Sequence, residues 1–124
     1  CDWQKARESL AIYKWLTEDY PPYNYLNQRG ELIGISTDIL LKVYQELGLN
    51  LKSQDILIVP LYVLEGNALN NFVFHHNTSE CVTSLFSEAM AKLHEQGDLI
   101  RIRDKYLVPI PINFESIKTN WNRY

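Results

Sequence analysis

The side chains best suited to bind a small molecule gather in one short loop. They are two adjacent carboxylates and three tyrosines: Glu18, Asp19, Tyr20, Tyr23 and Tyr25. Carboxylates attract cations and amines, and aromatic faces stack on rings or on positively charged groups. Pro21 and Pro22 stiffen the loop, which lowers the entropy lost when a ligand orders it. The loop is therefore the candidate ligand-binding site, and the alternative is a surface loop whose tyrosines cover the edge of a sheet.

The sequence lacks the arrangements that catalysis or metal binding requires. Glu18 and Asp19 are adjacent, so in an extended segment they point to opposite faces and make a poor acid–base pair. His75 and His76 diverge for the same reason, and no metal-ligand spacing surrounds them. Neither a G-x-G-x-x-G nor a G-x-S-x-G motif is present. We therefore expect no catalytic residue, no metal site, no cofactor and no enzymatic activity.

Length and composition fit one globular domain. The chain has 124 residues, of which 46% are hydrophobic and 22% are charged. A chain of this size buries roughly two-thirds of its unfolded surface. The formal net charge is −3, and the basic residues are scattered, which argues against nucleic acid as a partner. No apolar run approaches the length needed to cross a bilayer.

Cys1 and Cys81 are the two cysteines of the chain. They allow one disulfide, but the sequence does not establish that they meet. A chain that begins with Cys is typical of a processed bacterial lipoprotein, so Cys1 is a lipidation candidate, and a cloning boundary is the alternative. A lipid there is the one membrane association we expect. For Cys81, a small and mostly buried residue near a helix start is the favoured interpretation.

The candidate loop follows a predicted strand. Residues 10–16 are rich in apolar and aromatic side chains and predict that strand. Residues 23–35 predict a small hairpin-like excursion that turns at Gly30 and returns as a strand over 31–35. Further strand-like segments follow along the chain. They are residues 49–51, 56–59, 62–64 and 72–75.

An amphipathic helix is expected directly after the hairpin. Ser36 or Thr37 is the expected cap, and Asp38 lies in the positive first turn. Apolar residues then recur at helical spacing. Gly48 ends the helix in the left-handed conformation that glycine adopts without strain.

Two more helices are expected in the second half of the chain. The longer is capped by Thr78 or Ser79 and ends at Gly97. The shorter is capped by Asp98 and ends before the prolines that follow residue 107. Because strands and helices interleave, the sequence predicts an α/β fold.

Two runs of the sequence resemble bacterial extracellular solute-binding proteins of the amino-acid-binding type. Residues 17–50 match the start of that family and residues 72–107 match its end. The first match is carried by Tyr20, Pro21, Pro22, Tyr23, Tyr25, Gly30, Leu32, Gly34, Asp38, Leu47 and Gly48. The second is carried by Asn77, Thr78, Leu93, Gly97, Leu99, Ile102, Lys105 and Tyr106.

The resemblance implies a periplasmic-binding-protein-like lobe with a small central sheet and three layers. It divides the chain into residues 1–9 as an N-terminal tether or short frayed helix, 10–112 as the lobe, and 113–124 as a tail or docking helix. It implies a small polar solute, such as an amino acid or amine, as the ligand of the loop. It also implies a periplasmic or extracellular location and a role in ABC-type transport.

The chain departs from the family in one large respect. The second lobe and the S/T-x-x-R segment, whose arginine clamps a ligand carboxylate, are missing from the sequence. One lobe alone leaves a ligand half in water, which lowers affinity. We therefore expect a domain that forms a homodimer or has lost ligand binding. A non-catalytic interaction module that dimerises with itself is the alternative.

Overall fold

The computed structural model of the protein describes residues 1–59 and 72–107. Within these ranges the chain forms four α-helices and four short strands in two sheets. The predicted α/β class is thus confirmed in its coarse form: a mixed fold with a small sheet. The predicted strand over 62–64 and the predicted tail over 113–124 lie outside the described residues.

One sheet is a parallel pair made of β1 (Trp15–Thr17) and β4 (Ile56–Ile58). Trp15 lies opposite Ile56 in the register. Ile56 is buried, whereas Leu57 is half exposed, as expected when successive side chains point to opposite faces. The prediction of a strand over 56–59 is therefore confirmed for its first three residues, and its burial is confirmed for Ile56 alone among these three.

The other sheet is the predicted hairpin, made of β2 (Tyr25–Leu26) and β3 (Leu32–Ile33). The side-chain oxygen of Asn27 accepts from the N–H groups of Arg29 and Glu31, both at 2.9 Å, and so closes the turn.

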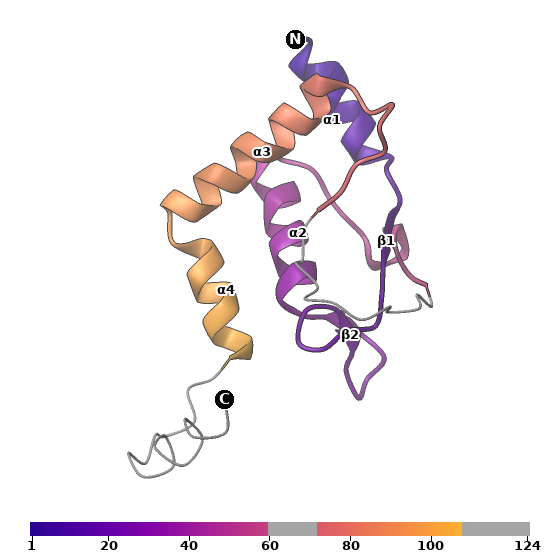
Figure 1. Cartoon of the computed structure of the whole chain (residues 1–124), viewed down its shortest axis with the longest axis vertical. Coiled ribbons are helices and arrows are strands. Elements are labelled where there is room, and N and C mark those ends of the chain that lie inside the picture. Colours follow the sequence, from indigo (N-terminus) through magenta and orange to yellow (C-terminus); the bar gives the residue numbers. More distant parts are fainter. Residues whose placement is uncertain (60–71, 108–124) are drawn as a thin grey trace.

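Of the four helices in the described residues, α2 lies between β1 and α4 (Figure 1). α1 contacts α3, and α4 leaves the end of α3 to lie beside α2. The helices are α1 (Trp3–Ala11), α2 (Ile35–Glu46), α3 (Glu80–Glu95) and α4 (Asp98–Tyr106).

The N-terminal segment differs from its prediction. The strand predicted over 10–16 is wrong except at Trp15 and Leu16, because α1 continues through residue 11 and β1 begins only at Trp15. Asp2 caps this helix by accepting from the Lys5 N–H at 3.1 Å. Ala6 and Leu10, one turn apart, are both buried in the core. Burial of this helical stripe outweighs the β propensity of the residues that follow it.

Two other predicted strands are not formed. Leu49 instead donates its N–H to the carbonyl of Tyr44 at 2.8 Å, which completes the end of α2 after Gly48. Residues 72–75 are assigned to no strand. Even so, Phe72 and Phe74 both pack their rings against Trp15 of β1, so this segment borders the parallel pair.

α2 begins two to three residues earlier than predicted. Its N-cap is Gly34, with φ of 132°, rather than Ser36 or Thr37. A Cβ at Gly34 would overlap the carbonyl of Tyr23, so the close approach of the loop requires glycine. The helix still holds Asp38 in its first turn and still ends before Gly48.

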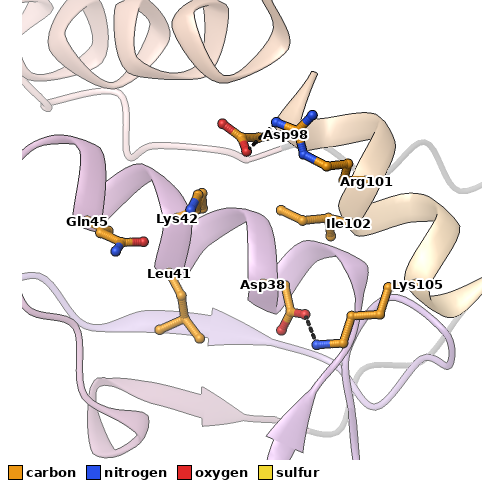
Figure 2. A pocket seen from close by; sticks show the side chains of 8 residues that line it. All are labelled: Asp38, Leu41, Lys42, Gln45, Asp98, Arg101, Ile102 and Lys105. Carbon is orange, nitrogen blue, oxygen red and sulfur yellow. Dashed lines mark hydrogen bonds and ion pairs between the residues drawn. The ribbon is translucent and has the colours of Figure 1, made fainter. Parts of the chain in front are cut away.

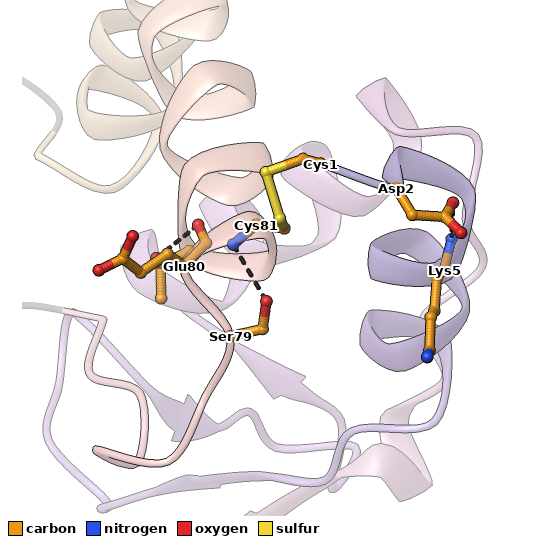
Figure 3. The surroundings of a disulfide bond; sticks show 7 residues. Cys1, Asp2, Lys5, Ser79, Glu80 and Cys81 are labelled. Atoms are coloured by element: carbon orange, nitrogen blue, oxygen red, sulfur yellow. Dashed lines mark hydrogen bonds between the residues drawn. A yellow bond between two sulfur atoms is a disulfide. The ribbon is translucent and has the colours of Figure 1, made fainter.

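A disulfide between Cys1 and Cys81 ties the N-terminus to the first turn of α3 (Figure 3). The pairing of the two cysteines, which the sequence left open, is therefore formed. Ser79 caps α3 by accepting a hydrogen bond from the Cys81 N–H at 3.1 Å, which confirms one of the two predicted caps. The same hydrogen bond holds the backbone of Cys81, the disulfide partner of Cys1. A sulfur in a disulfide cannot carry a lipid thioether, so the two states of Cys1 are mutually exclusive.

We predict that reducing this disulfide, or the change Cys81→Ser, lowers the free energy of unfolding by about 4 kcal/mol, because the bond closes a long loop in the unfolded chain. The two cysteines are 80 residues apart. Urea denaturation with and without reductant measures the difference, and Cys81→Ser should be insensitive to reductant. A thiol at Cys81 that reacts in the unreduced protein, together with an acylated Cys1 by mass spectrometry, contradicts this prediction.

Candidate functional site

A cleft of about 460 Å³ opens at the carboxyl end of β1. β1 supplies one wall, the first turn of α2 supplies another, and the segment that begins at Phe72 supplies a third. Its polar lining residues are Lys14, Thr17, Glu18, Asn24, Ser36, Thr37 and His75. Ligands of α/β proteins bind outside the carboxyl ends of strands, so this cleft is the candidate site.

A second hollow of about 500 Å³ adjoins the cleft. The two share Ser36 and Phe72 as lining residues. The second hollow is mainly apolar, with Phe86 and Met90 of α3 in its wall and Tyr23 at its rim. Together the hollows give a polar compartment beside an apolar one.

The proline loop is held tightly against the start of α2. Tyr20 and Asn24 exchange backbone hydrogen bonds of 2.6 and 3.0 Å. The Ile35 N–H donates to the Pro22 carbonyl at 2.9 Å, and the Ser36 N–H donates to the Tyr23 carbonyl at 3.0 Å. Because these carbonyls occupy two N–H groups of the first turn, the helix end offers a ligand fewer backbone donors than an open one.

The predicted site residues do not converge on one surface. Glu18 lines the cleft and Tyr23 lines the adjoining hollow. The Tyr20 ring stacks on Tyr23, with centroids 5.8 Å apart. The Tyr25 ring packs against Tyr106 of α4 and lines neither hollow. Asp19 is exposed and lines neither hollow.

Six of the seven polar residues that line the cleft were not predicted as site residues: Lys14, Thr17, Asn24, Ser36, Thr37 and His75. Asn24 was not considered, and Ser36 and Thr37 were interpreted as helix caps. Thr37 is 3% exposed, and its hydroxyl donates to Asn24 Oδ1 at 2.7 Å. Since Gly34 takes the cap position, the Ser36 side chain is available to line the cleft. The feature of the sequence that could have indicated this is Gly34, two residues before Ser36, as an alternative cap.

The two family-like runs meet at a hydrogen-bonded cluster between α2 and α4. The Gly34 N–H donates to the Tyr106 hydroxyl at 3.1 Å, and that hydroxyl donates to Asp38 Oδ2 at 2.8 Å. Lys105 Nζ also reaches Asp38 Oδ2, at 3.1 Å (Figure 2). Desolvation, and then the bond to Asp38, raises the pKa of Tyr106 above its usual value. The hydrogen bond and charge of Asp38 raise the pKa of Lys105.

A groove of about 370 Å³ lies beside this cluster, between α2 and α4. Figure 2 shows its lining residues, with Asp98 beside Arg101 and Asp38 beside Lys105. The Asp98–Arg101 pair is 2.8 Å apart. Because four of its charges are paired with one another, the groove is a weaker candidate for a charged ligand than the cleft.

The histidines do not form a metal site in the described residues. His75 lines the cleft, and its Nδ1 accepts from the Asn77 N–H at 3.1 Å. Across residues 1–59 and 72–107, no cluster of three or more His, Cys, Asp or Glu side chains could hold a metal ion. In the same ranges, no helix has both the length and the apolar character needed to cross a membrane.

Comparison of the chain with protein families, with curated proteins and with solved structures found no match.

We predict that Tyr106→Phe lowers the free energy of unfolding by about 1–2 kcal/mol, because the Gly34 N–H loses its acceptor. Wild-type stability should be full below about pH 10 and fall as the pH rises further, because the folded state holds the Tyr106 and Lys105 protons more tightly than the unfolded state. Urea denaturation at several pH values measures both effects. Tyr106→Phe should lose less stability at alkaline pH.

Tyr25→Phe is the matched control for this substitution. It keeps the ring contact with Tyr106 and removes a hydroxyl that is not part of the cluster. Equal destabilisation by the two variants would show that the hydrogen bonds of Tyr106 contribute nothing specific.

Proposed function

We propose that the protein is a single-lobe domain of the extracytoplasmic solute-binding type, which holds a small polar solute in the cleft at the carboxyl end of β1. The solute class we favour is an amino acid or another small amine. One observation carries the proposal. The carboxylate of Glu18, the amide of Asn24 and the hydroxyl of Ser36 line one cleft of about 460 Å³.

The polar groups of the cleft favour an amine over a purely anionic ligand. Glu18 can accept from an ammonium group in a charge-assisted hydrogen bond. At the start of α2, the loop carbonyls already take the N–H groups of Ile35 and Ser36. A ligand carboxylate there would depend on the Ser36 hydroxyl and on the positive end of the helix dipole. The ammonium end of the solute is therefore the better recognised end.

The size of the cleft supports a small solute, and its openness to solvent predicts weak binding. Pockets for small molecules are commonly about 300–1,000 Å³ and enclose most of the ligand. A cleft with walls on one lobe leaves part of the solute in water, so less apolar surface is buried. We therefore expect weak affinity for a free single lobe.

The meeting of the two family-like runs also supports the proposal. Gly34 and Asp38 belong to the first run, and Lys105 and Tyr106 belong to the second. Their hydrogen bonds join α2 to α4, which is what one lobe built from both runs requires. The three-layer lobe, the periplasmic or extracellular location and the link to ABC-type transport are part of the same proposal. The disulfide of Cys1 fits an oxidising compartment.

We predict that Glu18→Gln weakens binding of an amine solute about tenfold or more, because it removes a charged acceptor from the cleft. Thermal melts against a library of amino acids and polyamines first identify a solute that stabilises the wild type. Calorimetric titration with that solute then measures the change in Kd.

Asp19→Asn is the matched control. It removes the same charge from the neighbouring residue, which lines neither hollow. Binding should therefore survive it. If both variants bind as the wild type does, the cleft is not the site. If no library member shifts the melt of the wild type, the proposed function itself is wrong.

A further inference from the structure

An apolar patch lies on the face of the parallel pair that points away from the core. Leu16 of β1 and Leu57 of β4 are register partners on this face, and they are 67% and 50% exposed. Val73 is 80% exposed, between two phenylalanines whose rings contact the core residue Phe86. Val73 and Leu16 line the rim of the same cleft. Parallel strands normally have both faces covered, so this patch, exposed within residues 1–59 and 72–107, is a candidate contact surface.

Charged residues flank the patch in an order that suits a second copy of the same chain. Lys14, Leu16 and Glu18 occupy alternate positions along and just beyond β1, and all three line the cleft rim. Along the strand, this face therefore presents a positive, then an apolar, then a negative side chain. Rotation about a two-fold axis perpendicular to the strand reverses this order, so an identical face laid over it in that way places Lys14 against Glu18 of the second copy.

We propose that the protein forms a two-fold homodimer through this face, with the two apolar patches in contact and with Lys14 opposite Glu18 of the second copy. The ion pair of Lys14 with Asp55, at 2.7 Å within one chain, holds the lysine on this face. Because the rim of the cleft belongs to the same face, the second copy also covers the cleft opening. The proposal rests on the patch and its charges and does not depend on a solute.

The patch is small, so the dimer is expected to be weak and concentration-dependent. Sedimentation velocity over a concentration series of the intact protein tests it. The weight-average mass should rise toward twice that of the monomer. Leu16→Gln should keep the mass at that of the monomer, whereas the control Leu26→Gln should dimerise as the wild type does. Leu26 is 53% exposed but lies in the hairpin.

Charge reversal tests the orientation of the two copies. Lys14→Glu and Glu18→Lys should each be monomeric, because like charges meet across the two-fold axis. An equimolar mixture of the two variants should restore the dimer, because the two carboxylates of the first variant then face the two ammonium groups of the second. Circular dichroism verifies that both variants are folded.

Two results overturn the proposal. One is a wild type that stays monomeric at every concentration, as it would if the chain covered the patch itself. The other is a dimer that Leu16→Gln and both charge reversals leave intact. Dimerisation without any solute-induced shift would leave this proposal standing and reject the proposed function, and solute binding by a monomer would do the reverse.

Discussion

The hydroxyl of Tyr44 is the interaction on which the core depends. It accepts from the indole N–H of Trp15 at 2.8 Å and donates to the Leu10 carbonyl at 2.6 Å. One side chain thereby joins α1, β1 and α2. Tyr44 is 1% exposed, so loss of either partner would leave a buried polar group unpaired. Desolvation raises the pKa of Tyr44, which keeps the hydroxyl protonated and able to donate.

The hydrogen bond to Tyr44 determines where Trp15 lies, and Trp15 in turn contacts the segments that surround the small parallel sheet. Its ring contacts Phe86 of α3 as well as Phe72 and Phe74. The segment after residue 71 is thus drawn to β1 by aromatic contacts. Its inward and outward side chains alternate as in a strand, so it can form a wall of the cleft. The site therefore depends on core packing more than on sheet hydrogen bonds.

Local signals in the sequence predicted part of this fold. The two glycine-terminated helices and the hairpin were predictable because caps, turns and helical spacing act within a few residues. For residues 1–9 the sequence left a tether or a short frayed helix open, and the helix forms because Leu10 packs against a helix far along the chain and Cys1 is bonded to Cys81. The strand predicted over 49–51 failed because the N–H of Leu49 is used to finish α2.

The candidate site was predictable to a smaller extent, and Gly34 shows why. Tyr23 and Ser36 look independent in the sequence, one in a loop and the other a plausible cap. The approach of the Tyr23 carbonyl to Gly34 moves the cap by two residues, and the Ser36 side chain then lines the cleft. The same contact uses loop carbonyls to satisfy the helix end, so an arriving ligand meets side chains rather than backbone donors. Of the predicted site residues, Glu18 is the one that lines this cleft.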